Sequence, residues 1–299
     1  MTKILGIGRD SVFSPNSVSR DEAIFSLVVA KLQDLGACVD IAKEAEPEWQ
    51  KDLFLYNIVF SMARGKKALQ RLSLFEDSGG LVVNSAKSLL ANGRVALHSL
   101  FLKNGIPVAT SVDNPIVGNL PQGFAFPAWL KRGDACAQSR EDVCFVENEE
   151  DLQRHLNDFS KRGIESSLLS QHIEGDLVKF YGVEGSSFFH LGYPTSGNNF
   201  SKFGLEEKNG TPRGYGFSSM QLKACADKCA KIASFPIYGG DCIISPDGQF
   251  HIIDFNDWPS FSSCRNEAAE AIANFIMAKT SKVVPMREPS SRVHLNANI

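Results

Sequence analysis

The sequence predicts an α/β protein in which an N-terminal parallel α/β domain is followed by lobes that combine strands and helices. Three observations support this fold class. The chain has 299 residues, more than one hydrophobic core usually organises, so two or three domains or lobes are expected. Apolar runs alternate with helical segments over residues 1 to about 90, as in a parallel sheet. Further along, apolar runs follow one another across polar turns, which is typical of paired strands.

Each expected element of the N-terminal domain has a local reason. KILGIG at residues 3–8 is an apolar run suited to a buried first strand. Ser19 and Asp21 can cap the helix that follows, and Gly36 ends it. The glycines of this first strand do not form a dinucleotide-binding fingerprint, because a third glycine and the acidic partner are missing. The other elements of the domain are expected as strands at 38–42, 54–60 and 81–84 and a helix at about 66–75.

The rest of the chain continues with elements of both kinds. A helix at 94–103 is stopped by Asn104-Gly105. The stretch 193–215 is rich in glycine and asparagine and is long enough for a functional loop or mobile cover. The further strands are expected at 106–111, 125–131, 143–147, 167–173, 177–183, 242–245 and 250–255, and the further helices at 149–161, 218–233 and 267–280.

The most informative segment is 238–261, where two apolar runs flank the turn Pro246-Asp247-Gly248. A hairpin brings the start of one strand beside the end of the next, which places Asp241 near Asp254. Asn256 projects to the same face as Asp254, because alternate residues of a strand share a face. These side chains offer the oxygen ligands that Mg²⁺ prefers when it bridges carboxylates to nucleotide phosphates. The alternative is a polar hairpin end with solvated acids.

Two lysines in strand patterns add cations before this hairpin. Lys131 ends an apolar run, and Lys179 lies within LVKFYGV, an unusual place for a charge. Either one alone could be the solvent-facing residue of its strand, but two of them together favour a triphosphate site. Residues 171–173 could act as a hinge whose main-chain groups bind adenine, and Glu174 or Asp176 then falls where a ribose hydroxyl would lie.

The order of these parts along nearly the whole chain resembles the ATP-grasp superfamily. The segments that carry the resemblance are VVNSAKSLLANGRVALHSLFLKNGIPVATS, FPAWLK, SQHIEGD, LVKFYGVEG and IDFNDWPSF. The resemblance implies an N-terminal α/β domain followed by two α+β lobes that clamp ATP. It implies an N-terminal domain at 1–90, a central lobe at 91–175, a C-terminal lobe with the metal site at 176–284, and a flexible tail at 285–299.

The resemblance also implies roles for single residues. ATP is the implied cofactor, together with Mg²⁺ or, alternatively, Mn²⁺. Gln171 and Ile173 would bind adenine, and Asp176 would bind the ribose. The phosphates would be bound by Lys131, Lys179 and Arg94, the last of which stands where many members have lysine. The metal ligands would be Asp241, Asp254 and Asn256.

Two chemistries fit this machinery. In the ligase reading, a carboxylate attacks the γ-phosphorus and the acyl phosphate is then displaced by an amine; the stretch from NS to GIPVATS resembles RimK-type ligases. In the kinase reading, a polyol hydroxyl is the acceptor; the Asp-x-Asn pattern at 254–256 resembles the inositol trisphosphate kinase branch. The ligase is preferred because it dominates the superfamily. A third reading is a nucleotide-binding protein without turnover. The loop RGDACAQSRED has one glycine where many members carry a glycine-rich lid.

Arg64 is the residue expected to contact the acceptor, beside the catalytic lysines Lys131 and Lys179. It follows a buried strand, which is where α/β sheets place their binding residues. A densely phosphorylated acceptor would need more cations. The candidates for that role are Arg9, Arg20, Lys66, Lys67, Lys202, Lys208 and Arg213, and the simplest reading of most of them is solvated surface charge.

The amino-acid composition limits which classes of binding partner are expected. With 43% hydrophobic and 22% charged residues and a net charge of −3, the chain has no broad basic field, so nucleic acid is not an expected partner. Neither a signal-peptide core nor an apolar run of membrane-spanning length is present, and the cytoplasm is the expected location. The expected partners are ATP and a small-molecule carboxylate or polyol acceptor, and association into a homo-oligomer is left open.

Overall fold

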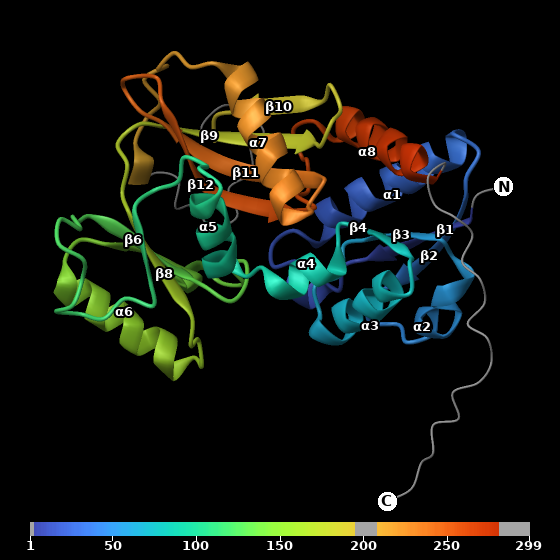
Figure 1. The fold of residues 1–299 in the computed structure, drawn as a ribbon, viewed down its shortest axis with the longest axis horizontal. Coiled ribbons are helices and arrows are strands. Elements are labelled where there is room, and N and C mark those ends of the chain that lie inside the picture. Colours follow the sequence, from blue (N-terminus) through green and yellow to red (C-terminus); the bar gives the residue numbers. More distant parts are fainter. Residues whose placement is uncertain (1–2, 195–207, 281–299) are drawn as a thin grey trace, which may run out of the picture.

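The computed structural model describes residues 3–194 and 208–280, which form three parts (Figure 1). A cleft lined by residues of all three parts lies between them. Each part of this described chain is built on one four-stranded sheet. The tail at 285–299 and most of the expected cover at 193–215 lie outside the described residues. The three sheets with their helices confirm the α/β fold class with α+β lobes.

The N-terminal sheet is parallel and has the strand order β2-β1-β3-β4. Its two inner strands are buried because helices cover both faces of the sheet, as Figure 1 shows. Helices α1 and α8 pack on one face, and α2, α3 and α4 lie on the other. Its elements are β1 (Lys3–Gly8), α1 (Val18–Asp34), β2 (Cys38–Lys43), α2 (Trp49–Asp52), β3 (Ile58–Ser61), α3 (Lys66–Asp77), β4 (Leu81–Val83) and α4 (Ala86–Ala91), with 3₁₀ turns at Ser11–Phe13 and Leu53–Leu55.

The central sheet is antiparallel and has the order β5-β8-β6-β7. Helix α6 packs on one face, against Ala128, Leu130 and Leu169. The alternate residues Trp129 and Lys131 therefore project from the other face into the cleft. The elements are β5 (Ser111–Asp113), β6 (Ala128–Arg132), a 3₁₀ turn (Arg140–Asp142), β7 (Val143–Val146), α6 (Glu149–Lys161) and β8 (Ser167–Gln171).

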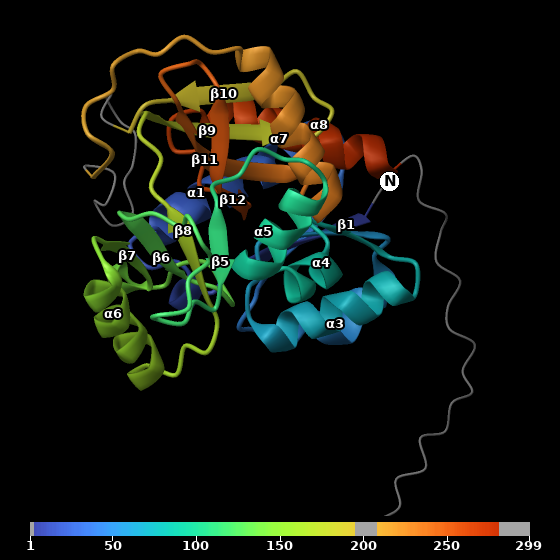
Figure 2. The same cartoon turned by 60° about the vertical axis from the view of Figure 1, so that its left-hand side comes forward.

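The C-terminal sheet is antiparallel with the order β10-β9-β11-β12. Helices α5 and α7 cover one face through residues such as Phe101 and Leu222, and Figure 2 shows both beside this sheet. The elements are α5 (Arg94–Lys103), β9 (Asp176–Val183), β10 (Phe189–Gly192), α7 (Ser219–Ala233), β11 (Ile237–Ile244), β12 (Phe250–Asp257) and α8 (Arg265–Thr280). No helix in the described ranges combines the length and apolarity needed to cross a bilayer.

Several elements differ from the sequence-based expectation. A strand was expected at 106–111, but β5 begins at Ser111, because Ile106 and Val108 pack against the C-terminal sheet instead. The short elements α2, α4 and β10 were not expected at all. The strand expected at 54–60 begins only at Ile58, because residues 53–55 form a 3₁₀ turn, and β11 begins at Ile237, before the expected 242–245. Helix α5 packs on the C-terminal sheet and α8 packs on α1, so the chain crosses between the parts more often than the expected boundaries suggest. Those boundaries remain a prediction.

Candidate functional site

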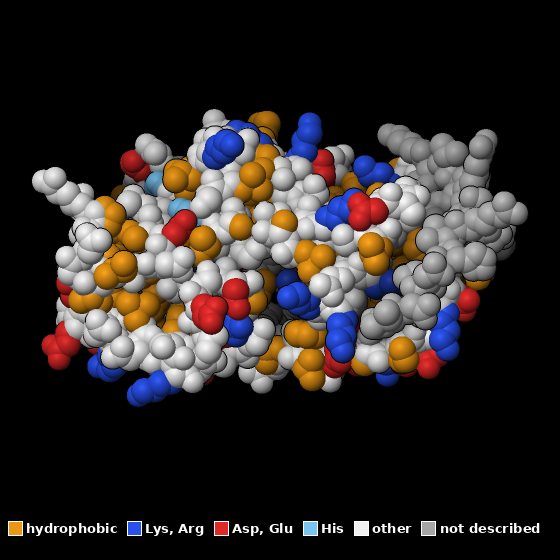
Figure 3. All heavy atoms as spheres, turned by 60° about the horizontal axis from the view of Figure 1, so that its bottom comes forward, with side chains coloured by type: hydrophobic (Ala, Val, Ile, Leu, Met, Phe, Trp, Pro, Cys, Tyr) orange, Lys and Arg blue, Asp and Glu red, His pale blue; other side chains and the backbone are white. Residues whose placement is uncertain are grey.

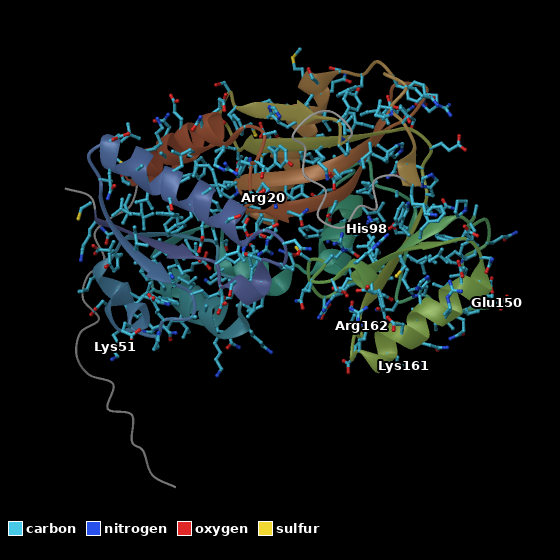
Figure 4. The ribbon with its side chains drawn as sticks, turned by 180° about the vertical axis from the view of Figure 1, so that it is seen from behind. Arg20, Lys51, His98, Glu150, Lys161 and Arg162 are labelled. Carbon is cyan, nitrogen blue, oxygen red and sulfur yellow. The ribbon has the colours of Figure 1, made fainter. Side chains whose placement is uncertain are left out.

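A cleft of about 510 Å³ runs between the three parts and holds most of the residues expected to bind ligands. It extends from the loops after β1 and β3, past the ends of β6 and β12, to the end of β8. Figure 3 shows Lys and Arg side chains beside a recess near the middle of one face. Figure 4 shows His98 of α5, which also lines this cleft, in the region where the central and C-terminal parts meet.

Lys179, Asp241 and Asp254 form a row across three neighbouring strands. Asp241 is the register partner of both Lys179 on β9 and Asp254 on β12. Lys179 Nζ lies 3.2 Å from Asp241 Oδ1. The row exists because a short turn fixes the β11–β12 register.

The ladder shifts register immediately beside this row. Asp241 pairs with Asp254 but Cys242 pairs with Ile252, which leaves Ile253 without a ladder partner. The Ile253 carbonyl instead accepts a hydrogen bond of 2.9 Å from Lys131 Nζ. The irregularity therefore joins the central lobe to the carboxylate strand.

Arg94 is the second cation on Asp254, at 2.6 Å from Oδ1. It is the first residue of α5, where the helix dipole disfavours a positive charge. The pairing with Asp254 offsets that cost, and the Arg94 Nε also donates to the Arg132 carbonyl. Burial would raise the pKa of Asp254, but attraction by Arg94 and Lys131 outweighs it and holds that pKa below its ordinary value.

Lys131 is nearly enclosed, with 8% of its surface exposed. Burial, together with repulsion from Arg94, lowers the pKa of its ammonium to about 8. Desolvation disfavours the charged form, so an incoming anion would restore the charge to this side chain.

Asn256 completes the oxygen set. Its Nδ2 donates to Asp254 Oδ2 at 3.0 Å, and its Oδ1 accepts a hydrogen bond from the Cys136 thiol at 3.2 Å. Cys136 belongs to the loop between β6 and β7 that has only one glycine. Asp142 anchors this loop by accepting hydrogen bonds from the backbone N–H groups of Gln138 and Ser139 and by pairing with Arg162.

Asp241, Asp254 and Asn256 fit a hard divalent cation in ligand chemistry, because two carboxylates and an amide oxygen lie on adjacent strands. Within the described ranges no group of three or more His, Cys, Asp or Glu side chains is placed to hold a metal. A metal here would therefore depend on Asn256 and on phosphate oxygens of a nucleotide for the rest of its coordination.

The end of the cleft beside the end of β8 has flat rings and main-chain groups of the kind that can bind a nucleobase. Gln171 and Ile173 line it as expected, and so do Trp129 and His172. The Trp129 indole donates to His172 Nδ1 at 3.1 Å, and the rings pack with Phe145. His172 therefore contributes to this wall.

Asp176 does not lie in the cleft. It is buried, and its two oxygens accept hydrogen bonds from the backbone N–H groups of Arg213, Gly214 and Tyr215. A carboxylate occupied in this way holds the 213–215 segment, so the expected ribose contact does not fit this residue.

Arg64 lies at the other end of the cleft, after β3. Its guanidinium pairs with Asp257 Oδ1 at 2.5 Å and donates to the Cys136 Sγ at 3.6 Å. Arg9, after the neighbouring strand β1, pairs with Asp21 at 2.9 Å.

The loops that carry these two arginines are held by one carboxylate. Glu44, at the end of β2, accepts hydrogen bonds from the backbone N–H groups of Asp10, Arg64 and Gly65. Sequence reasoning missed both Glu44 and Asp257. Asp257 directly follows Asn256, and this proximity was the one available signal.

The sequence matches no family model and no curated protein. Solved structures do resemble this one. D-alanine–D-alanine ligase from Bacillus anthracis, crystallised with ATP, has a TM-score of 0.64 at 11% identity, covering 94% of this chain and 99% of that one. A RimK domain ATP-grasp protein from Sphaerobacter thermophilus has a TM-score of 0.64 at 15% identity, covering 92% and 100%. D-alanine–D-alanine ligase from Coxiella burnetii has a TM-score of 0.61 at 11% identity, covering 95% and 98%. At these identities the similarity establishes the fold.

Proposed function

We propose that this chain, which has the ATP-grasp fold, is an ATP-dependent ligase that joins a carboxylate to an amine through an acyl phosphate. One observation carries the proposal. Three cations, Arg94, Lys131 and Lys179, converge in one cleft with the carboxylates of Asp241 and Asp254. This arrangement suits a triphosphate bound together with a divalent cation.

Each group has a role in this proposal. Gln171 and Ile173 bind the adenine, while Lys131, Lys179 and Arg94 bind the phosphates. Asp241, Asp254 and Asn256 would hold Mg²⁺, which would supply charge neutralisation between the β- and γ-phosphates. Lys131 is also held by the Ile253 carbonyl and Arg94 by the Arg132 carbonyl, so both cations keep a backbone contact when the carboxylates turn to the metal.

The chemistry itself needs no protein nucleophile. A substrate carboxylate attacks the γ-phosphorus, the bond to the β-phosphate oxygen breaks, and ADP leaves. The amine then attacks the acyl carbon and expels phosphate, with loss of one proton. Holding the reactants in line and excluding water accounts for the acceleration expected of such a site.

The kinase reading has less support from the charges at the acceptor end. Of the residues that the structure describes, Arg9 and Arg64 are the cations there, and each is paired with a carboxylate, Asp21 or Asp257. A densely phosphorylated polyol would need unbalanced positive charge. Lys202, another candidate, lies outside the described residues, and Lys208 lies over the ring of Phe145.

The proposal is tested by trapping the intermediate. The protein with Mg·ATP and a panel of carboxylic acids is treated with hydroxylamine, which converts an acyl phosphate to a hydroxamate. Hydroxamate that requires both ATP and one carboxylate supports the ligase. Formation of a phosphate ester with a polyol, without hydroxamate, would support the kinase function instead of the ligase function. ATP binding without ADP release from any acceptor would leave a non-catalytic nucleotide-binding protein.

A further inference from the structure

Four charged side chains form one cluster at the end of the cleft where the acceptor is expected, beside the loops that follow β1 and β3. They are Arg9, Asp21, Arg64 and Asp257. Arg9 and Arg64 donate to the consecutive carbonyls of Trp258 and Asp257, so their guanidinium groups lie side by side at the end of β12. Arg9 pairs with Asp21 and Arg64 pairs with Asp257. Two guanidinium groups and two carboxylates give this cluster no net charge.

The four groups also interact across the pairs. Arg9 is attracted by both Asp21 and Asp257 and repelled by Arg64, and burial together with this repulsion lowers its pKa. Arg64 is likewise attracted by Asp21 as well as Asp257. All four side chains line the cleft, and at most 21% of any of them is exposed.

The cluster has both hydrogen-bond donors and acceptors to offer a ligand. A guanidinium has five N–H donors, and within residues 3–194 and 208–280 those of Arg9 engage three acceptors, on Met62, Asp21 and Trp258. On the acceptor side, Arg9 and Ser14 both bond the Oδ2 of Asp21, not its Oδ1.

Asp257 provides the second observation. Its side chain is 2% exposed, and its Oδ2 has no hydrogen-bond partner among the residues that the structure describes. Buried carboxylate oxygens are nearly always hydrogen-bonded, so this oxygen beside the cleft calls for a donor that the described residues do not supply.

We propose that this cluster binds the amine substrate as a zwitterion, with Arg9 and Arg64 holding its carboxylate and Asp257 with Asp21 holding its ammonium group. The acceptor class is then an α-amino acid or a peptide of similarly spaced charges. A charge-balanced pocket favours a molecule that is itself balanced, and it disfavours plain amines, plain acids and polyphosphates, which each leave one half of the cluster unpaired. The inference rests on the proposed ligase function, because it identifies the second substrate of that reaction.

Calorimetry on the whole protein saturated with Mg·ADP tests the inference directly. The probes are the standard α-amino acids, each compared with the amine that lacks its carboxylate and the acid that lacks its amine. We expect at least one amino acid to bind about tenfold or more tightly than both of its truncated counterparts. Equal binding of the plain amine, or no binding by any amino acid or dipeptide, would overturn the inference.

Variants locate the site. Asp257→Asn and Asp21→Asn should each weaken amino-acid binding at least about tenfold while nucleotide affinity stays within about twofold of wild type. Asp77→Asn, in an exposed ion pair with Lys87 on the helical face, is the matched control and should change neither. Unchanged amino-acid affinity in both cleft variants would place the ligand elsewhere. Hydroxamate formation with a carboxylic acid, without binding of any amino acid, would support the ligase function and contradict the amino-acid site. Absence of hydroxamate with every carboxylic acid would contradict the ligase function itself.

Discussion

Arg94 and Asp254 are 160 positions apart in the chain, and their side chains meet at 2.6 Å. The contact joins the first turn of α5 to the last strand of the C-terminal sheet. Because Arg94 also donates to the Arg132 carbonyl, it connects the central loop to the carboxylate row. Four consequences of this site can be measured.

Asp254→Asn should lower ATP turnover by at least about a hundredfold, because it removes one of the proposed metal ligands and the charged partner of Arg94. Only 27% of the Asp254 side chain is exposed, so the variant also leaves Arg94 with a weakened counterion. We expect a loss of about 1–3 kcal/mol in the free energy of unfolding. Steady-state ADP release and urea unfolding measure the two effects. Wild-type turnover in a folded Asp254→Asn protein would remove Asp254 from the site.

Nucleotide affinity should fall as pH rises through about 8. The pKa of Lys131 is lowered to about 8 by burial, so the free protein carries the full charge below that pH and loses it above. The neutral amine cannot pair with a phosphate, which makes the dissociation constant for ATP rise in the alkaline range. Titrations of bound nucleotide between pH 6.5 and 9.5 should show this bend at about 8. Lys131→Met should bind weakly at every pH, and a bend that persists in this variant would assign it to another group.

Asp176→Asn should destabilise the protein without changing how it selects the ribose. The two oxygens of the wild-type carboxylate accept three backbone N–H groups from 213–215, whereas the amide of the variant has only one oxygen, and its NH2 group cannot accept. We expect a cost of about 1–3 kcal/mol and the same ratio of affinities for ATP and 2′-deoxy-ATP in both proteins. A ratio that collapses toward one in the variant would restore the ribose contact to Asp176.

Gly240→Ala should lower stability and nucleotide binding, because the added methyl group would push β11 away from β9 and β12 beside Asp241. A Cβ at Gly240 would lie 2.4 Å from the Asp254 carbonyl and 2.4 Å from the Phe180 ring. Such overpacking typically costs about 1–3 kcal/mol, and here it also displaces the carboxylate row. Thermal unfolding and nucleotide binding should both report the loss. Gly216→Ala is the control, since nothing lies within 4 Å of its added Cβ; equal stability of the two variants would contradict the close packing.

The site was predictable from sequence where its geometry is local. A short turn between two apolar runs fixes the register of a hairpin, so the opposition of Asp241 and Asp254 follows from the residues between them. Lys179 could be singled out because a charge within an apolar strand is unusual, but its pairing with Asp241, 62 positions away, depends on β9 lying beside β11 and was not predicted. The expected helix at 149–161 coincides with α6 because its signals are local: Asn148 caps it, and acids fill its first turn.

Contacts between distant segments could not be predicted in this way. The partners of Asp176 come from a segment 37 to 39 residues away, and no pattern near Asp176 points to them. The cluster of Arg9, Asp21, Arg64 and Asp257 depends on how the N-terminal domain docks on the end of β12, which periodicity does not encode. Strand β5 was misplaced because its preceding residues are extended but serve a different sheet.

The pairing of Asp241 with Lys179 and of Asp254 with Arg94 gives the resting protein a built-in set of counterions. A divalent ion arriving alone must compete with two cations that are tethered to the chain and therefore present at high effective concentration. A nucleotide changes this competition, because its phosphates offer Lys179 and Arg94 new partners and release the carboxylates at the same moment. Metal and nucleotide should therefore enter as a mutually dependent pair, and neither should bind well without the other.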